Sequence, residues 1–476
     1  MDSRSQSRPN EVLVIAVAGV VLASLDLFIV NIALPKIAVD LHQTDLSKLS
    51  WVLNAYAIVY AALLVYFGRL ADRYRRDRGF LLGVTVFTLA SAGCAAAPDL
   101  GVLIGFRVVQ AAGAALLTPT SLGLLLASFE PHRRSAAVRA WTAAGGMAAA
   151  FGPVLGGLLV EVNWRWVFLV NVPIGIASVL VGWRRLPAVA GHPVEHPDPF
   201  GAVLATVGVG ALTLGLIEGS DWGWRSAGVL TALAAAAILL AAFVLHCLYS
   251  RTPLVHPDLF RVRSFTGASV VAVLFSAAFG AMLLSIVLWE QDVWHWSALR
   301  SGLAIAPGPL MVPLVSFGVA GRLIARYGPG RIITAGSVIF AASFAWWALA
   351  VTLRPDYVSG ILGGMLLSGV GVGLTLPTIM ATAAASLPPE SFATGSAVVT
   401  MVRQTGMALG VAIIVPVLAG GGLTQFQHAW WVTFTLALLG AAAAIGLLGR
   451  TVPVPVATVP PAHADASAIP LTQGTT

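Results

Sequence analysis

Residues 68–74 read Gly68-Arg-Leu-Ala-Asp-Arg-Tyr74 and residues 321–327 read Gly321-Arg-Leu-Ile-Ala-Arg-Tyr327, so five of seven positions agree. Each segment follows the second long apolar run of its part of the chain. A second matching pair runs from Gly113 to Thr120 and from Gly371 to Thr378, both ending in Pro-Thr. The two offsets, 253 and 258 residues, are nearly equal. This repeat predicts two similar halves that lie parallel in the molecule.

The chain between these motifs is strongly apolar. Charged residues make up only 10% of the 476, whereas a soluble domain needs about 25% to cover its surface. The apolar runs are each long enough to cross ~30 Å of hydrocarbon as a helix, and they fall at 12–34, 49–68, 79–97, 101–126, 137–160, 166–183, 199–217, 227–249, 265–289, 301–320, 332–352, 358–380, 396–418 and 429–449. We predict an all-α membrane protein with about 14 transmembrane helices, built as two parallel six-helix bundles plus two extra central helices.

The repeat and the runs together divide the chain into five parts. A cytoplasmic N-terminal tail, 1–11, is followed by an N-terminal six-helix bundle, 12–184. The two additional helices and their flanking cytoplasmic loops occupy 185–263, and the C-terminal six-helix bundle occupies 264–450. Residues 451–476 are rich in Pro, Ala and small polar residues, which predicts a disordered cytoplasmic tail.

Basic residues indicate which loops face the cytoplasm. With the N-terminus inside and the runs alternating, two of the 27 Lys and Arg residues lie within spans, at Arg107 and Arg403. Outer segments hold six, and the remaining 19 lie on the cytoplasmic side; the six are Lys36, Lys48, Arg165, Arg225, Arg300 and Arg354. This bias places both termini in the cytoplasm and explains the net charge of +7 without nucleic-acid binding.

Several protein classes are disfavoured. There is no phosphate-binding Gly-x-x-x-x-Gly-Lys, and no Ser, His and carboxylate set lies outside the apolar runs, so we expect no enzyme, no cofactor and no metal site. Cys94 and Cys247 lie in apolar runs, which predicts buried free thiols. The first run contains Asp26 and Asn31 and lacks an Ala-x-Ala exit, so we expect a retained helix and not a cleaved signal peptide.

Asp26 lies in the middle of the first run, where an isolated carboxylate is costly. Such a carboxyl can carry a proton or pair with a cationic substrate. The alternative is a structural carboxyl that is bonded to a neighbouring helix, with Asn31 as one candidate partner. Arg107 lies within the fourth run and needs a carboxylate or carbonyl partner, for which Asp26 is the candidate. Gln110 lies one turn along on the same face. Arg107 is either a proton-coupling group or a clamp between helices.

The fifth run contains Gly152, Pro153, Gly156 and Gly157. Small residues allow helices to approach closely, and Pro removes a backbone donor. We expect this helix to seal the cytoplasmic side and to rock during transport; the alternative is passive packing.

The loop at Gly68, Asp72, Arg73 and Arg76 is a tight cytoplasmic turn that contains cations and one carboxylate. Its residues could form an ionic latch that holds one conformation, with Asp72 paired to an Arg, or they could serve only to orient the chain.

Two further groups are candidates. Glu290 and Asp292 end the ninth run among Trp residues, and they are either interfacial or a second protonation or cation-attracting site near the outer mouth. Arg403 and Gln404 lie near the cytoplasmic start of the thirteenth run. There Arg403 could take part in coupling or extend its side chain to the lipid headgroups.

These motifs resemble those of the Major Facilitator Superfamily. The loop from Gly68 to Arg76 is similar to its signature loop, although Arg75 stands where the family usually has Gly. Four other segments resemble motifs of its fourteen-span drug/proton antiporter branch or of the superfamily, and they are Leu25–Pro35, Arg107–Gly113, Gly152–Gly157 and Trp164–Gly175. Arg403-Gln404-x-Gly406 resembles the motif of the penultimate helix. The resemblance implies that Arg107 assists proton transfer and that the glycines of the fifth helix belong to an antiporter.

We therefore expect a proton-coupled transporter of the inner (plasma) membrane that exports amphipathic drugs or antibiotics by alternating access. The proton gradient would supply the energy, and the protein would act as a monomer in the lipid bilayer. One alternative is a transporter of a specific metabolite or nutrient on the same fold. Another is a receptor or scaffold that transports nothing, although no run of the sequence suggests the soluble domain that such a protein would need.

Overall fold

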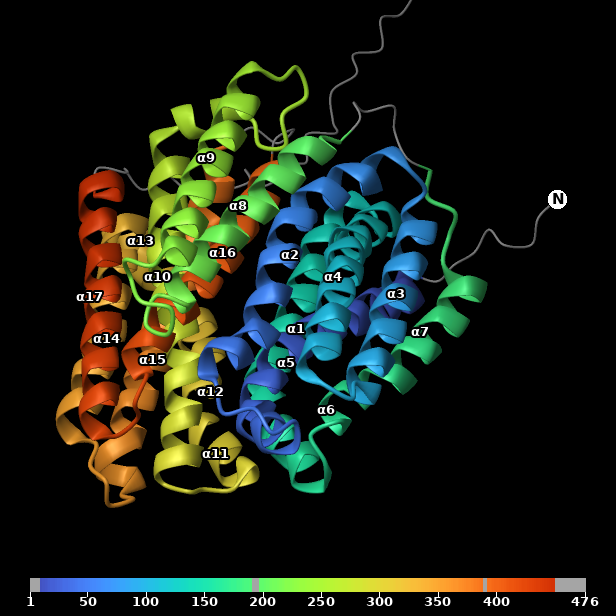
Figure 1. The fold of residues 1–476 in the computed structure, drawn as a ribbon. Coiled ribbons are helices and arrows are strands. Elements are labelled where there is room, and N and C mark those ends of the chain that lie inside the picture. Colours follow the sequence, from blue (N-terminus) through green and yellow to red (C-terminus); the bar gives the residue numbers. More distant parts are fainter. Residues whose placement is uncertain (1–8, 191–196, 388–391, 450–476) are drawn as a thin grey trace, which may run out of the picture.

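The computed structural model describes residues 9–190, 197–387 and 392–449. All regular elements in these ranges are helices, in the order that Figure 1 shows. Thirteen of them are long and apolar enough to cross a membrane, and helix α5, bent by 44° between Ala140–Ala149 and Phe151–Val162, brings the number to fourteen. The prediction of an all-α membrane protein with about fourteen spans is therefore confirmed. The expected N-terminal and C-terminal tails fall largely or wholly outside the described residues.

The chain forms two groups of helices that lie side by side in Figure 1. The first group consists of α1 (Pro9–Asp40), α2 (Leu46–Arg73), α3 (Arg76–Ala96), α4 (Leu100–Ser128), α5 (Pro131–Val162), α6 (Trp166–Leu169) and α7 (Asn171–Arg185). The second group begins with α10 (Arg263–Leu288), η2 (Trp289–Val293), α11 (Ala298–Ile305), α12 (Pro307–Val315), η3 (Ser316–Ala320) and α13 (Gly321–Tyr327). It continues with α14 (Pro329–Ala350), η4 (Tyr357–Leu362), α15 (Gly363–Ala385), α16 (Phe392–Leu418) and α17 (Leu423–Leu448). Segments η2, η3 and η4 are π-helical.

The internal repeat of the sequence corresponds to a repeated helix contact. A Cβ at Gly113 on α4 would lie 2.6 Å from the backbone nitrogen of Phe87 on α3. A Cβ at Gly371 on α15 would lie 2.7 Å from the backbone nitrogen of Phe340 on α14. Only glycine permits backbones to approach this closely. The same helix pair is thus packed through the same glycine in each half, as expected for parallel halves.

The two extra helices, α8 (Pro199–Ile217) and α9 (Ala227–Tyr249), form a hairpin. Asp198 holds its base, because its carboxylate accepts hydrogen bonds from the backbone nitrogens of Gly201 and Leu254 and lies 2.9 Å from His246 Nε2. At the other end, Ser47 on α2 donates to Asp221 in the α8–α9 loop at 2.8 Å. Helix α8 contacts α2 of the first group and α16 of the second, so the hairpin bridges the two groups.

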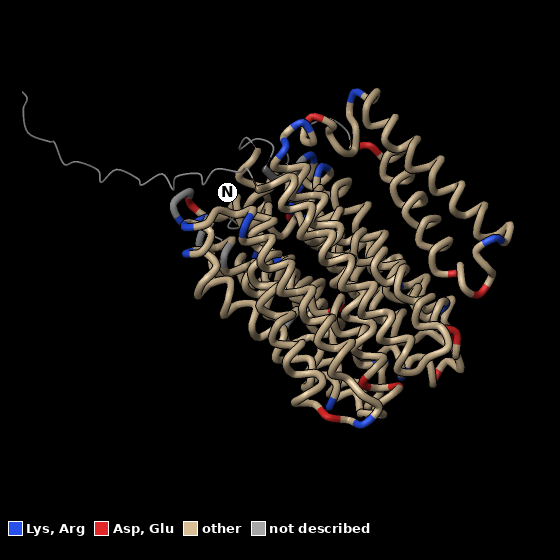
Figure 2. The backbone as a smooth tube through the Cα atoms, turned by 90° about the vertical axis from the view of Figure 1, so that its left-hand side faces the viewer, with Lys and Arg blue, Asp and Glu red and all other residues tan. Residues whose placement is uncertain are grey.

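Most charged residues lie near the two ends of the helices, and few lie in the long middle section (Figure 2). Many large apolar side chains on the outside of the bundle are exposed, among them Leu180, Trp183 and Leu349. An exposed apolar band of this extent marks a surface that is covered in the native environment, here by lipid.

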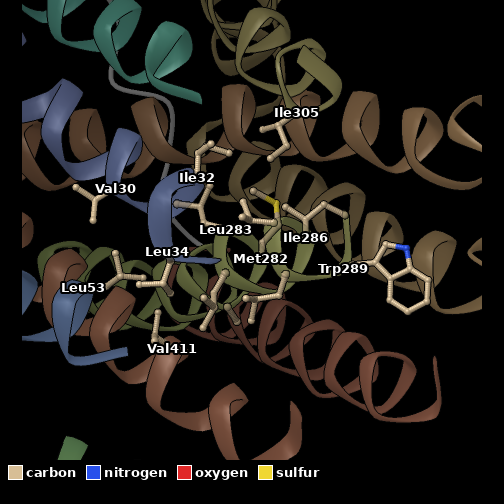
Figure 3. Close-up of a cluster of buried hydrophobic side chains, with 14 of the residues drawn as sticks. Val30, Ile32, Leu34, Leu53, Met282, Leu283, Ile286, Trp289, Ile305 and Val411 are labelled. Carbon is tan, nitrogen blue, oxygen red and sulfur yellow. The ribbon is translucent and has the colours of Figure 1, made fainter. Parts of the chain in front are cut away.

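The two groups meet in a shared apolar core. Figure 3 shows Ile32 of α1 beside Leu283 and Ile286 of α10, with Val30 of α1 and Val411 of α16 in the same cluster. Gln291 reinforces this contact, because its side chain donates to the backbone carbonyl of Ile32 at 3.1 Å. The core therefore joins the halves near the end of the bundle that contains Asp40 and Trp296.

Candidate functional site

Asp26 lies on α1 with no exposed surface. Its two carboxylate oxygens accept hydrogen bonds from three side chains on two other helices. From α4, Arg107 donates to the Asp26 carboxylate, and Gln110 Nε2 donates to it at 2.8 Å. From α7, Asn171 Nδ2 donates to it at 3.2 Å. A carboxylate in an apolar interior is tolerated when it is paired and hydrogen-bonded in this way.

Arg107 is the cation of this site and is only 1% exposed. Its guanidinium donates to Asp26, to Gln110 Oε1 at 2.7 Å and, through Nε, to the backbone carbonyl of Val52 at 3.0 Å. It also lies over the ring of Tyr56, with 4.1 Å between the guanidinium carbon and the ring centre. The charge is thus balanced by one carboxylate, two carbonyl-type oxygens and one aromatic face.

Two members of this network were not among the residues singled out as functional in the sequence. Ser91 on α3 accepts from Gln110 at 2.8 Å, and Asn171 bonds both Asp26 and Ser91. Asn171 lies within the Trp164–Gly175 motif, so the sequence could have pointed to it as a site residue. A lone Ser in an apolar helix, such as Ser91, gives no such indication. The partner proposed for Asp26, Asn31, was wrong: its amide donates to the backbone carbonyl of Leu27 one turn back on its own helix.

A row of aromatic residues on α2 leads from Arg107 toward the second group of helices. Tyr56 and Tyr60 stack with 5.8 Å between ring centres, and the Tyr60 hydroxyl bonds Thr118 at 3.3 Å. Helix α16 packs along α2, and the Arg403 Nε on α16 is buried. Arg403 therefore faces α2 at the boundary between the groups and does not extend to a lipid-facing end. Its neighbour Gln404 is also buried.

The glycines of α5 pack on two different partners. Gly152 and Gly156 face α1, where a Cβ would lie 2.9 Å from Phe28 Cβ and from Ile29 Cγ1. Gly157 faces α11 of the other group, where a Cβ would lie 2.6 Å from the Ala298 carbonyl oxygen. Gly302 packs equally closely on the Pro153 carbonyl, and Glu161 accepts from the Leu299 backbone nitrogen at 3.3 Å. We name this contact between α5 and α11 the α5–α11 seam.

The α5–α11 seam lies near one end of these two helices. Gly146 lies further along the same side of α5, is exposed, and would have no atom within 4 Å of an added Cβ. In the second group of helices, Pro313 and Phe317 lie further along the chain from Gly302, and both are exposed as well. We expected α5 to seal the cytoplasmic side. In this structure it contacts the other half at the Glu161 end, which the charge bias places outside, because only there do small residues face each other.

The basic loop between α2 and α3 contains one described ion pair, between Arg75 and Asp77, with 2.6 Å between Nη2 and Oδ2. The side chain of Arg76 lies against α4, where a Cβ at Gly123 would be 2.8 Å from its Cδ. Gly68 packs near Pro119 of α4, and Arg73 ends α2. The side chain of Asp72, the expected carboxylate of a latch, lies outside the described residues.

The two carboxylates at the end of α10 differ in their surroundings. Glu290 has no exposed surface. Asp292 borders a cavity of about 540 Å³ whose wall is mostly apolar and comes mainly from the end of α1 and the start of α2, including Leu34, Ala38, His42 and Leu46. Of these two carboxylates, Asp292 borders this cavity and Glu290 is enclosed. In the described ranges, no three His, Cys, Asp or Glu residues lie close enough together to bind a metal ion.

The chain is similar to known transporters over most of its length. The model of the Major Facilitator Superfamily matches residues 16–411. A cephamycin export protein of Amycolatopsis lactamdurans is 33% identical over 87% of this chain and 86% of its own length. A tetracenomycin C resistance and export protein of Streptomyces glaucescens is 32% identical over 89% and 79% of the two chains. A methylenomycin A resistance protein of Streptomyces coelicolor is 32% identical over 93% of each.

Solved structures show the same fold at lower sequence identity. A POT family transporter in complex with a thioalcohol-conjugated peptide matches with a TM-score of 0.69 and 15% identity, over 92% of this chain and 96% of that one. An auto-inhibited POT family peptide transporter matches with a TM-score of 0.68 and 17% identity, over 93% and 98%.

Proposed function

The chain belongs to the Major Facilitator Superfamily, and on this premise we propose that it exports amphipathic, antibiotic-like molecules across the plasma membrane in exchange for protons. The relatives at 32–33% identity that are named for antibiotic export or resistance support the direction and the substrate class. The observation that carries the proton part of the proposal is the buried Asp26–Arg107 pair.

The pair suits proton coupling because the ionised and the protonated forms of Asp26 leave Arg107 in states of very different energy. With Asp26 ionised, Arg107 is neutralised and both side chains can remain in an apolar interior. A proton on Asp26 removes that balance and leaves a buried cation, which favours a conformation in which the guanidinium reaches water. Return of the proton to the cytoplasm releases ~2.3 kcal/mol per 100 mV of membrane potential. We assign Gln110 and Asn171 to positioning the carboxylate, since both donate to it.

The α5–α11 seam supports alternating access. Gly157 and Pro153 bring α5 against α11 at the Glu161 end, whereas Gly146 nearer the other end of α5 has no atom within 4 Å of an added Cβ. The charge bias indicates that the Gly146 end is cytoplasmic, with both termini on that side. Substrate would enter from the cytoplasm here and leave after the seam opens. We assign Gly152 and Gly156 to the pivot on α1, and Gly157 to the seam.

Two further groups complete the proposal. Arg403 would sense the state of the first half through the packing of α16 on α2, and Gln404 lies beside it on α16. The basic loop, with Gly68, Asp72, Arg73 and Arg76, would latch the cytoplasmic ends in the outward-facing state. The transporter would act as a monomer, because each chain contains both halves of the pathway.

A transporter of a specific metabolite on the same fold is the main competing function. It shares the pair and the seam, so only transport assays separate the two. The relatives' names favour antibiotic export, and none of those we cite is named for uptake of a nutrient.

The test begins with antibiotic susceptibility of cells with and without the protein. We expect raised resistance to a subset of amphipathic compounds, and the purified protein in liposomes should export those compounds when an inward proton gradient is imposed. Unchanged susceptibility across the panel together with uptake of a metabolite would overturn the export proposal. Export that persists at full rate after the gradient is collapsed would overturn proton coupling.

A further inference from the structure

Glu290 is the second fully buried carboxyl of the described membrane core, and its surroundings are unlike those of Asp26. It is the second residue of the π-helical segment η2, which continues α10. Neither of its carboxylate oxygens has a hydrogen-bond partner among the described residues, and the same is true of the buried hydroxyl of Ser301 on α11. Single π-helical turns within α-helices are frequent at functional sites.

Among the described residues, no cation faces Glu290 from the elements packed around it. Ser301 is the polar group that α11 contributes, and Tyr357 at the start of η4 lies near Glu290. The Tyr357 hydroxyl donates to the Ala304 carbonyl and is therefore engaged elsewhere.

The charged side chains near η2 point to other groups. Arg300 lies over the Trp296 ring at 4.1 Å, and His295 interacts with Asp292. From α17, Phe426 and Trp430 pack on Trp289, and both are apolar at their contact.

A carboxylate that is ionised, desolvated and unpaired costs far more than the same group in its neutral form. Asp26 escapes this cost through Arg107. Glu290 has no such partner, so the neutral, protonated form is the one that suits this structure.

Helix α11 connects Glu290 to the α5–α11 seam. Ser301 immediately precedes Gly302, whose added Cβ would collide with the Pro153 carbonyl of α5. Leu299 on the same helix donates its backbone N–H to Glu161. The helix that covers Glu290 on one side is therefore the helix that closes the seam on the other. A movement of α11 that opens the seam would therefore also change the cover of Glu290.

We propose that Glu290 is a second proton-binding site of this protein, occupied while the α5–α11 seam is closed and exchanging its proton with the outer solution when the seam opens. The proposal rests on the proposed proton-coupled exchange, because it adds a second proton to each cycle. Ser301 would be a positioning residue that holds the protonated carboxyl.

The first test reads the proton directly and does not depend on transport. Infrared difference spectra of the purified full-length protein should contain the C=O band of a protonated carboxyl at neutral pH. We expect loss of this band in Glu290→Gln and its retention in Asp356→Asn, an exposed matched control. A wild-type spectrum without the band, or a band unchanged in Glu290→Gln, overturns the proposal. Since the wild-type spectrum is decisive by itself, failure of a variant to fold does not remove the test.

The second test uses the seam. A disulfide between Glu161→Cys and Leu299→Cys should lock α5 to α11. The C=O band should then no longer shift rapidly when the protein is transferred to deuterium oxide. The rapid shift should return when the disulfide is reduced. Equal exchange in the locked and reduced forms contradicts gating by the seam.

The third test measures protons moved per substrate from the reversal potential in liposomes. We expect Glu290→Gln to transport with one proton fewer than wild type, and an unchanged ratio would make the bound proton structural. If wild type itself shows no proton coupling, the proposed function fails, while the infrared result still decides whether Glu290 holds a proton.

Discussion

The Asp26 carboxylate on α1 and the Arg107 guanidinium on α4 form an ion pair in which the side chains are 0% and 1% exposed. The residues are 81 positions apart in the sequence, and their pairing ties the first helix of the bundle to the fourth. Removing one partner of a buried pair leaves an uncompensated charge and costs about 3–5 kcal/mol. The pair is therefore costly to disturb, and its two proposed roles, coupling and clamping, can be separated by experiment.

Asp26→Asn should abolish proton-driven export, because the amide cannot take up or release a proton. It should also lower stability by about 3–5 kcal/mol, since Arg107 is left unpaired in the interior. Export into liposomes under an imposed gradient and thermal unfolding in detergent measure the two effects.

The double variant Asp26→Asn with Arg107→Gln provides the control for this change. With no buried charge left, it should regain most of the lost stability but none of the gradient-driven export. Recovery of both properties together would mean that the pair is only a clamp between α1 and α4.

Gly157→Ala should hinder closure of the α5–α11 seam. The added methyl group would lie 2.6 Å from the Ala298 carbonyl oxygen and from Leu299 Cα, both of which are backbone atoms that cannot turn away. Disulfide formation between cysteines at positions 161 and 299 should become slower, and export should fall. Gly146→Ala is the matched control on the same helix, because nothing lies within 4 Å of its Cβ position. Equal crosslinking in the two variants would contradict a steric role for Gly157.

Tyr56→Phe should leave stability within about 0.5 kcal/mol of wild type. The Tyr56 hydroxyl is buried without a partner, and the ring that lies over Arg107 is kept. Tyr60→Phe loses a bond to Thr118 and should cost about 1 kcal/mol. Tyr56→Leu removes the aromatic face and should cost about 2 kcal/mol, as for a desolvated cation–π contact. Chemical unfolding of the three variants checks this order, and a large loss in Tyr56→Phe would reveal a partner for the hydroxyl.

Glu218 should make stability depend on pH. Burial raises the pKa of this carboxyl above its ordinary value of 4.5, and the like charges of Asp45 and Asp221 add to the effect. A raised pKa in the folded state means that stability is fully present below pH 4.5 and is lost as the pH rises through the raised value. The melting temperature of Glu218→Gln should therefore exceed that of wild type by a margin that grows from pH 4.5 upward.

Asp356 should make stability depend on pH in the opposite direction to Glu218. Hydrogen bonds from Ser359 lower its pKa below 3.8, so its contribution to stability is present above that pH and is lost as the pH falls. Asp356→Ala should lower the melting temperature at neutral pH, with a difference that disappears in acid. If both variants respond to pH in the same direction, the surroundings assigned to one of them are wrong.

The sequence alone predicted most of the spans, because a bilayer requires about 20 consecutive apolar residues and the chain shows this pattern directly. The run at 301–320 illustrates the limit. It was expected as one helix, and it is divided into α11, α12 and the π-helical η3. Pro307 begins α12 and Pro313 lies inside it, and hydropathy does not show where such a helix changes its geometry.

The candidate site shows the same limit at the level of single residues. Asp26 and Arg107 could be named because a charge in an apolar run is conspicuous without any structure. Asn31 was chosen as a partner because it is near in sequence, but it lies more than one turn away along α1 and bonds Leu27. Asn171 takes that role from 145 residues away.

The sequence by itself therefore determined the membrane class, the parallel repeat and the charged residues that the interior must accommodate, since these depend on composition and spacing along one chain. Only the tertiary structure decided which groups meet: Asn171 and Ser91 at the Asp26–Arg107 pair, and Gly157 against Ala298 at the seam. It also decided that Glu290 meets no cation among the described residues. The physical reason is that helices pack through side chains distant in sequence, so the partner of a buried group is set by the crossing of two helices and not by the pattern of either one.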